Sequence, residues 1–473
     1  MKIRSNTYWF NHKLLMKIFR NIILGFLALI VIAAIGTFTT VDRTELHQTE
    51  FYAQMQNWLA DYTPDTEPQY DSVYVGWAKV NLTPSQPLAT AGYGNRDGKP
   101  YQSVHDSIYV RAMVFDNGRK FAMVSCDLLI IPPEVRLSLQ DRLGKIGFSW
   151  EHVFIGATHT HNSIGAWGKN AIGELFAGKY HPEVVEDIAN KIVKAIQLAD
   201  ANTTAAEIGY GQIDTPELVF NRLVHEKGTV DPTVRLLKIH KDNGQNALIC
   251  VYSAHATTLN ADKMVLSRDY PGVLVDKLEK DQADFAMFMA GSVGSTGPIG
   301  EEMKDDYAQL NRMADGLYQK IAKINPQIKT ALVDNLHASV IPLSMRAPQV
   351  RVSQDLRFRP WVFQTFFGEY PAEMKVFQLG NTIFVGTPCD FSGELMPEVL
   401  KTAQAQHLNL MVTSFDGSYV GYITEDSHYD LNSYETRVMN WYGPQNGQYF
   451  QEIINSILIK NAPSVKIQEP EEK

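Results

Sequence analysis

Two histidines that lie one residue apart follow an apolar stretch of the chain. The sequence HVFIGATHTHNS ends in His159 and His161. Side chains two residues apart on a strand point to the same face, so the spacing predicts both imidazoles on one face. Such a pair can share a metal ion, although H-x-H also occurs as surface or hydrogen-bonded histidines. Ser163 and Ile164 stand where H-x-H-x-D-H would need Asp and His, which argues against a dinuclear site of that pattern.

Two further potential metal ligands also follow apolar strand-like segments. His255 ends CVYSAH, and Asp390 follows TIFVGTPC. The ends of strands at one sheet edge are where α/β enzymes gather their functional side chains. Each residue also has a structural interpretation, because a lone histidine can be a hydrogen-bonded residue of the core and an aspartate commonly caps the next helix.

The last region of the sequence with candidate functional residues is rich in tyrosine. It contains Tyr419, Tyr422, Tyr429 and Tyr434 and ends in the sequence WYGP at residues 441–444. Tyrosines in loops usually pack and form hydrogen bonds, but a phenol can also ligate zinc or stabilise an oxyanion.

The elements that must position these residues alternate between strands and helices. The residues 116–118, Asp-Asn-Gly, predict a tight hairpin between two apolar strands, with φ > 0 in the turn. Predicted helices at 133–146, 182–199, after 270, 305–324, 394–404 and 448–462 alternate with apolar strands. We therefore predict an α/β fold: a layered mixed β-sheet flanked by helices, in a single large catalytic domain.

Taken together, five motifs in the same order resemble the neutral/alkaline (non-lysosomal) ceramidase family. GATHTHNSIG resembles its GTHTHSGPGG, FNRLV its NRSP segment, and HATTLN with LSRDYPG its HGTSM and SGDNKGYA. TPCDFSGEL resembles PGEFTTMAG, and the tyrosine-rich region resembles the family's Y-x-x-Y-I-T-T and RYEAAST-x-YGP. The resemblance spans about residues 75–444.

This resemblance implies a Zn²⁺-dependent amide hydrolase acting on ceramide or a related N-acyl lipid. It places His159, His255, Asp390 and Tyr422 on the zinc ligands. It places His161, Arg222 and Tyr434 on the residues that line the reaction centre. We expect metal-bound water to attack the acyl carbon, with His161 exchanging a proton and Arg222 and Tyr434 donating hydrogen bonds to developing negative charge.

Three features depart from the family's pattern. Asp390 replaces a glutamate ligand and has a shorter reach, and the family's N-x-G-D-x-S-P block reads SVGSTGP at 292–298, without its Asp and Ser. A serine nucleophile in that block is therefore excluded. The chain ends soon after the tyrosine motif, without room for the family's C-terminal immunoglobulin-like domain, which leaves ceramide itself a less secure substrate.

The composition of the chain limits which kinds of partner we expect it to bind. A net charge of -9 and the lack of dense basic clusters argue against nucleic acid as a partner. The cysteines Cys126, Cys250 and Cys389 are three in number and widely spaced, which predicts neither a disulfide framework nor a thiolate zinc site. The partners that we expect are a lipid or N-acyl substrate and a membrane.

The N-terminus predicts that membrane contact. Five basic residues precede the uncharged apolar segment 22–38: Lys2, Arg4, Lys13, Lys17 and Arg20. An uncleaved transmembrane anchor is favoured over a cleaved signal peptide, with the basic flank in the cytoplasm and the rest periplasmic or extracellular. The predicted organisation is a cytoplasmic N-terminus (1–21), an anchor (22–38), a spacer (39–71), a ceramidase-like catalytic domain (72–462) and a disordered tail (463–473).

Two other functions fit the same residues. One is a zinc hydrolase of another N-acyl or ester bond. The other is a non-catalytic, membrane-anchored binding protein that kept the fold, an interpretation suggested by the altered 292–298 block and by Asp390.

Overall fold

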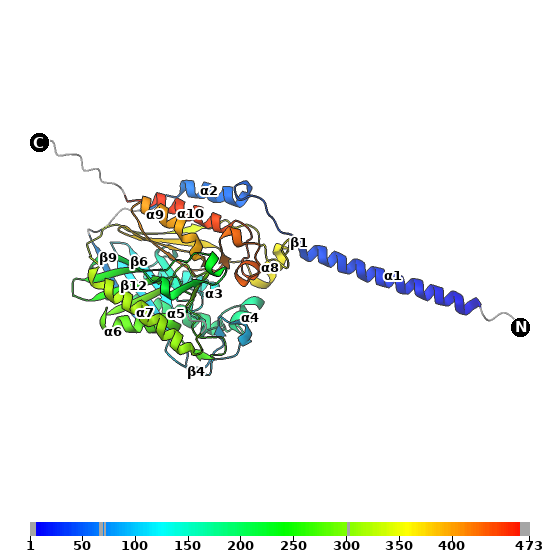
Figure 1. The fold of residues 1–473 in the computed structure, drawn as a ribbon, viewed down its shortest axis with the longest axis horizontal. Coiled ribbons are helices and arrows are strands. Elements are labelled where there is room, and N and C mark those ends of the chain that lie inside the picture. The colour runs from blue at the N-terminus through cyan, green and yellow to red at the C-terminus, as the bar shows by residue number, and fades with distance from the viewer. Residues whose placement is uncertain (1–5, 66–69, 71, 300–302, 464–473) are drawn as a thin grey trace.

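The computed structural model describes residues 6–65, 70, 72–299 and 303–463, and the side chains from residue 12 onward (Figure 1). The predicted basic residues Lys2 and Arg4, and the predicted tail from residue 464, lie outside this part of the chain. A layered mixed α/β body lies beside one long N-terminal helix, which extends away from it.

The largest element of the body is a mixed eight-stranded sheet in the order β14-β12-β11-β9-β2-β5-β6-β7. Only the outer pairs, β12 with β14 and β6 with β7, are parallel. In chain order its strands are β2 (Val73–Asn81), β5 (Tyr109–Asp116), β6 (Lys120–Cys126), β7 (Val153–Ala157), β9 (Thr204–Asp214), β11 (Thr233–Lys241), β12 (Asn246–Tyr252) and β14 (Phe285–Ala290).

Apolar side chains on both faces of these strands explain why the sheet lies inside the body. On β6, Phe121 and Met123 face one core while Ala122 and Val124 face another. The helices α3 (Pro133–Leu143) and α5 (Pro182–Asp200) cover the outer face near β5 and β6. The helices α6 (Asp269–Asp281) and α7 (Asp306–Ile324) cover it near β12 and β14.

A second, four-stranded sheet packs on the inner face of the first. It has the order β16-β18-β19-β21, with strands β16 (Leu336–Pro342), β18 (Glu373–Leu379), β19 (Thr382–Gly386) and β21 (Asn409–Thr413). Phe377 and Phe384 pack with Phe115 and Phe154 between the sheets. The far face is covered by α2 (Glu50–Asp61), α9 (Met396–Ala405) and α10 (Asn446–Lys460), which makes four layers.

The two edges of the eight-stranded sheet approach each other. Ser125 Oγ on β6 donates a hydrogen bond to the carbonyl oxygen of Phe288 on β14, with 2.5 Å between the two oxygens. The segments that follow β7 and those that follow β12 and β14 therefore meet, although these strands are at opposite edges of the sheet.

Short two-stranded ladders fix the connections around this meeting point. They pair β3 (Thr90–Ala91) with β8 (Ser163–Ile164), β4 (Ser103–Val104) with β13 (Val265–Leu266), β10 (Val219–Asn221) with β15 (Thr296–Pro298), and β20 (Asp390–Phe391) with β22 (Tyr422–Ile423). Two short helices, α4 (Ala171–Ala177) and α8 (Pro360–Phe367), lie nearby.

The N-terminal helix α1 (Asn6–Thr37) is long and apolar enough to cross a membrane over His12–Thr37, with none of its most apolar window buried in the body. Strand β1 (Phe38–Thr40) follows immediately and pairs with β17 (Leu356–Phe358). Within the segment predicted as a spacer, α2 packs through Met55 and Leu59 onto α10. Residues 46–62 are thus part of the folded body, because Leu46, Met55, Leu59 and Tyr62 are buried against it, and residues 38–40 are joined to it by the β1–β17 pairing.

Most predicted elements agree with the structure. The predicted hairpin is formed by β5 and β6, but only Gly118 has a positive φ, at 98°, because three residues rather than two connect the strands. All three cysteines are free and buried. The layered mixed α/β class is confirmed.

Candidate metal and active site

The predicted site residues come from separate segments of the chain that meet near the converging sheet edges. His159 and His161 follow β7, and His255 follows β12. Arg222 follows β10, and its backbone N–H donates to the carbonyl oxygen of Ser295 beside β15 (2.9 Å). The backbone joins these segments directly: the N–H of His161 donates to Ala256 O (3.3 Å) and that of His255 to Thr296 O (3.1 Å).

Asp390 and Tyr422 are brought together by the short parallel ladder β20–β22. They are opposed residues in its register, and the N–H of Asp390 donates to Gly421 O (3.0 Å). Gly421 has φ 83°, and a Cβ there would lie 2.2 Å from Met439 O, so the approach of these segments requires glycine. A carboxylate and a phenol 32 residues apart in sequence therefore emerge side by side.

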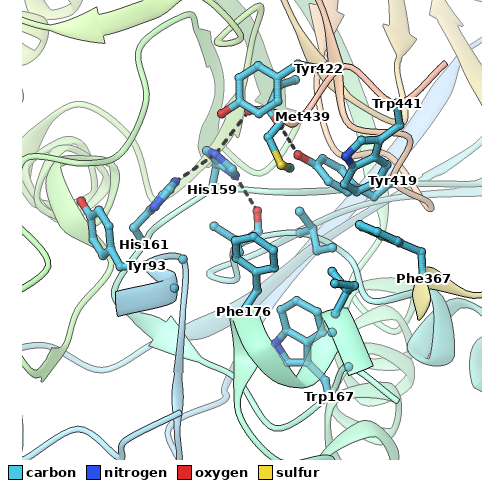
Figure 2. Close-up of a pocket in the computed structure, with 18 of the residues that line it drawn as sticks. Tyr93, His159, His161, Trp167, Phe176, Phe367, Tyr419, Tyr422, Met439 and Trp441 are labelled. Atoms are coloured by element: carbon cyan, nitrogen blue, oxygen red, sulfur yellow. Dashed lines mark hydrogen bonds and ion pairs between the residues drawn. The ribbon is translucent and has the colours of Figure 1, made fainter. Parts of the chain in front are cut away.

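The sequence predicted that strand alternation brings His159 and His161 to one face. The structure brings them together by a turn instead. Strand β7 ends at Ala157, and His159 has φ 63°, in the left-handed region. This conformation costs a residue with a Cβ about 1–3 kcal/mol and occurs preferentially at functional sites. The turn still brings the rings together, with 3.1 Å between His159 Nε2 and His161 Nε2 (Figure 2).

Four polar atoms surround a common point. Asp390 Oδ1 lies 3.6 Å from His159 Nε2 and 3.2 Å from His255 Nε2. Tyr422 Oη lies 3.1 Å from His255 Nε2. The ligand atoms of His159, His161 and His255 all lie within 4.8 Å of one another. The four residues predicted to be metal ligands thus converge.

The protonation pattern of this group suits a cation. His159 Nδ1 donates to Leu129 O and His255 Nδ1 to Val293 O, at 2.7 and 2.8 Å, so each Nε2 presents its lone pair. Asp390 Oδ1 faces those lone pairs, is buried, and accepts no hydrogen bond from any described residue. Lone pairs that face a carboxylate repel it unless a positive ion lies between them. Two imidazoles, a carboxylate and a phenol fit the donor set of zinc.

Burial keeps the imidazoles neutral and so able to bind a metal. Burial lowers the pKa of His159 to about 3, against the opposing effect of Asp390. Burial is also the main reason why the pKa of His161 and that of His255 lie well below the usual value. Neighbouring His159 lowers the pKa of His161 further, and Arg222 lowers that of His255. Burial also raises the pKa of Asp390 and, reinforced by Asp390, that of Tyr422.

Arg222 lies against the same group. Its Nη2 donates to Tyr422 Oη (2.9 Å) and to Gly294 O (3.3 Å) and lies 3.2 Å from His255 Nε2. Its Nε lies 3.1 Å from Glu435 Oε1. Burial alone would lower the pKa of this guanidinium, but Tyr422, Glu435 and Asp390 raise it, so Arg222 stays charged. The positive charge of Arg222 therefore lies directly beside the phenol of Tyr422 and the imidazole of His255.

Several residues in contact with this group were not assigned a role from the sequence. Tyr419 donates to Asp390 Oδ2 (2.6 Å), and the ring of Phe415 stacks on His159 at 3.9 Å between centroids. Tyr93 lies 4.9 Å from the His161 ring, beside Gly92, whose missing side chain leaves room for that imidazole. The tyrosine-rich region pointed to Tyr419, but no pattern pointed to Phe415 or Tyr93.

A cavity of about 870 Å³ opens from this group. His159, His161, Arg222, Asp390, Tyr422 and Tyr434 lie at its polar end, and Tyr434 contacts Tyr422 at 5.9 Å between ring centroids. Figure 2 shows Trp167, Phe176 and Phe367 across the cavity from the histidines. The cavity therefore combines a polar centre with a long apolar wall, as a site for an amphipathic molecule needs.

A family model confirms the resemblance found in the sequence. The model described as "Neutral/alkaline non-lysosomal ceramidase, N-terminal" matches residues 74–295. Over these residues the chain is similar to the neutral/alkaline non-lysosomal ceramidases. The match contains His159, His161, Arg222 and His255, whereas Asp390, Tyr422 and Tyr434 lie beyond it.

Among curated proteins, the chain is similar to neutral ceramidases of several organisms. It is 25% identical over 233 residues to that of Pseudomonas aeruginosa and 24% over 264 residues to that of Mycobacterium tuberculosis. It is 26% identical over 223 residues to neutral ceramidase A of Dictyostelium discoideum. These alignments cover 46%, 48% and 43% of this chain, but only 35%, 41% and 31% of the respective relatives.

The fold is similar over a longer part of the chain. The crystal structure of neutral ceramidase from Pseudomonas aeruginosa matches with a TM-score of 0.71 at 18% identity, over 85% of this chain and 75% of that one. A structure titled as ceramidase complexed with C2 matches with a TM-score of 0.72 at 18% identity, over 82% and 75%. The ceramidase fold therefore extends beyond the residues that the family model matches.

The block that departs from the ceramidase pattern contributes backbone rather than side chains. Val293 O and Thr296 O both face His255 Nδ1, at 2.8 and 3.3 Å. Ser295 Oγ is buried and lies 2.5 Å from Ser392 Oγ. This block holds the imidazole of His255 in place, a role that needs carbonyl groups and no particular side chain.

Proposed function

We propose that this chain is a zinc-dependent hydrolase that cleaves the amide bond of ceramide or a related N-acyl lipid, tethered to a membrane by α1 with its body on the extracytoplasmic side. The convergence of His159 Nε2, His255 Nε2, Asp390 Oδ1 and Tyr422 Oη carries the proposal. The family match and the curated relatives named neutral ceramidase support the substrate class.

His159, His255, Asp390 and Tyr422 would hold the zinc ion. When bound there, zinc lowers the pKa of a water molecule and polarises a carbonyl group, the two effects that hydrolysis of an unreactive amide needs most. The Nδ1–H bonds of His159 and His255 to backbone carbonyls fix each ring and direct Nε2 to the centre.

His161 is the residue placed to move a proton. It is neutral, its Nε2 lies 3.1 Å from His159 Nε2, and its buried Nδ1 has no hydrogen-bond partner among the described residues. An imidazole with one free nitrogen can take a proton from the attacking water and return it to the leaving amine.

Arg222 and Tyr434 act on the substrate oxygen. Arg222 is a partly buried, permanently charged donor that Glu435 and Tyr422 hold in place. Tyr434 contributes a half-exposed phenol at the entrance to the polar end. Fixed donors aimed at developing negative charge lower the barrier, because they need no reorganisation during the reaction.

The decisive experiment compares the parent protein with a His159→Ala variant. Zinc content by mass spectrometry and release of fatty acid from ceramide and from N-acyl amino acids are measured for both. We expect stoichiometric zinc and ceramide turnover in the parent, and loss of both in the variant, with a rate at least about 10³-fold lower. Undiminished turnover in the variant would refute the scheme, and a His47→Ala variant at an exposed histidine serves as the control.

The same experiment separates the competing functions. Stoichiometric zinc without turnover of any N-acyl substrate would favour a binding protein that kept the fold. Faster turnover of N-acyl amino acids or esters than of ceramide would favour a hydrolase of another bond.

A further inference from the structure

Helix α8 is apolar on both of its faces. Phe363 and Phe367 point inward, line the cavity, and stack on each other at 4.3 Å between ring centroids. Trp361 and Phe366 point outward and are 52% and 48% exposed. Gln364 and Thr365 are also exposed, but two large exposed aromatic side chains on a helix of eight residues indicate an interaction surface.

Other exposed apolar side chains lie around the same entrance. Leu175 on α4 is 56% exposed, and α4 contributes Ile172 and Phe176 to the cavity. Tyr434 and Val438 are 47% and 51% exposed. We call α4, α8 and residues 434–438 the rim surface. Contiguous exposed apolar groups of this kind mark interaction surfaces.

The candidate membrane span is fastened to the rim surface. Trp361 Nε1 donates to Gly36 O, Arg359 Nε to Ile35 O and the Arg359 N–H to Thr37 O, each at 2.8 Å. Strand β1 then pairs with β17 immediately before α8. Figure 1 shows α1 leaving the body beside α8. No free linker separates the span from the entrance to the cavity.

From these contacts we propose that the rim surface lies in the headgroup region of the bilayer that α1 spans, so that the cavity opens toward the membrane. The identity of the entering lipid rests on the proposed function, whereas the position of the surface does not. An N-acyl lipid then enters the cavity from the bilayer and moves along its apolar wall to the polar end without passing through water.

The length and surface of α1 favour a bilayer over a second protein as the occupant. The 26-residue span is about 39 Å long, which exceeds the roughly 30 Å of a hydrocarbon core and places its last turn at the headgroups. Ile35, in that last turn, is 61% exposed, and its carbonyl oxygen accepts from Arg359 while that of the next residue, Gly36, accepts from Trp361. Tryptophan and arginine are typical at this depth, where an indole or a long stem meets both lipid and water.

A labelling experiment on the full chain in phosphatidylcholine vesicles tests the position without requiring any catalysis. All native cysteines are buried, so a Phe366→Cys variant can be labelled selectively with an environment-sensitive fluorophore. A Leu332→Cys variant is the control, since Leu332 is 60% exposed and follows Ala331, which bridges to Ile208 on β9. Strand β9 lies on the side of the body away from α1 in Figure 1. We expect a spin-labelled lipid to quench the label at 366 at least about threefold more strongly than that at 332.

Two results would overturn the proposal. One is equal and weak quenching at both positions. The other is a label at 366 that is shielded from aqueous iodide but not quenched by the lipid, which would indicate a protein partner or a second copy. Neither outcome depends on whether the chain hydrolyses ceramide.

A second measurement tests the route of the substrate. Phe366 and Leu175 do not line the cavity, so we change both to Asp and compare turnover of vesicle-embedded ceramide with that of a soluble short-chain N-acyl substrate. We expect a loss of about tenfold or more on vesicles and little change on the soluble substrate, because only the first requires docking. Equal losses on both substrates, or none, would contradict the membrane route; a Leu332→Asp variant is the control.

Discussion

The two ends of the cavity are built by different means. The polar end lies at strand termini and on the β20–β22 ladder, and hydrogen bonds to backbone carbonyls orient the side chains of His159, His255 and Arg222. The apolar end lies on the short helices α4 and α8, where aromatic rings pack without directional bonds. The comparison suggests that chemistry requires the rigid part, whereas recognition of an apolar chain requires only shape and area.

Removing a charge from the polar end should have the largest effect. In Asp390→Asn the carboxylate between His159 and His255 becomes neutral, so we expect zinc affinity to fall by about 10³-fold and hydrolysis with it. Competition with a fluorescent zinc chelator measures the affinity. The longer Asp390→Glu side chain keeps the charge and should retain zinc within about tenfold of the parent; equal loss in both variants would mean that geometry rather than charge decides.

Truncating the apolar wall should affect substrate binding and leave the metal in place. Phe367→Ala removes a ring that lines the cavity, so we expect kcat/KM for a long-chain N-acyl substrate to fall about tenfold, mainly through KM. Phe366→Ala changes the neighbouring residue on the opposite face and should leave turnover of a soluble short-chain substrate unchanged. Loss of zinc from Phe367→Ala would show that the two ends are not independent.

Substituting a residue that hydrogen-bonds to a metal ligand should lower zinc affinity less than substituting the ligand itself. Tyr419 donates to Asp390 Oδ2, and Tyr419→Phe removes that bond while keeping the ring. Outer hydrogen-bond partners of this kind contribute about 10–100-fold to metal affinity, and we expect the lower end for zinc. Isothermal titration of zinc into the metal-free protein checks this value; a loss as large as that of Asp390→Asn would make Tyr419 a ligand in its own right.

Stability of the metal-free protein should depend on pH through the buried imidazoles. Burial holds the pKa of His159 at about 3, below the value near 6.5 of the unfolded chain. Between those values the unfolded chain binds the proton, so the contribution to stability is complete above about pH 6.5 and is lost as the pH falls, by up to about 1.4 kcal/mol per unit.

Unfolding by urea between pH 7.5 and 5 measures this effect in the presence of a chelator. Buried carboxyl groups such as Asp426, whose pKa burial raises to about 6, change stability in the opposite direction, so the parent is compared with His159→Gln. The variant should show the shallower loss toward acid. Parallel curves would mean that His159 is not held neutral.

The sequence was most informative where local patterns decide the structure. The apolar runs around β6 and β12 predicted the presence of these strands, and the periodicity of α5 and α7 predicted both helices to within one residue at each end. All seven predicted site residues line or border one cavity, and the motifs, not their spacing, selected them. The left-handed turn at His159 was missed, because an unusual φ leaves no mark in a single sequence.

Long-range packing accounts for the rest. Strand β14 meets β6 because the whole sheet curls, and the sequence of no single segment predicts this contact. The same is true of the packing of α2 on α10, because the short and mostly polar sequence of α2 does not show that Met55 and Leu59 are buried. Phe415 and Tyr93 were missed for this reason, since their roles depend on neighbours distant in sequence.

The β20–β22 ladder has a consequence for recombining this fold with its relatives. Asp390 and Tyr422 are opposed in a register only two residues long, and a slip by one residue would turn both side chains away from the imidazoles. The segment from 388 to 424, which we call the cassette, therefore carries the carboxylate of Asp390 and the phenol of Tyr422 as one unit. Chimeras whose junctions fall outside that cassette should inherit a complete half of the centre, whereas junctions inside it should separate the pair.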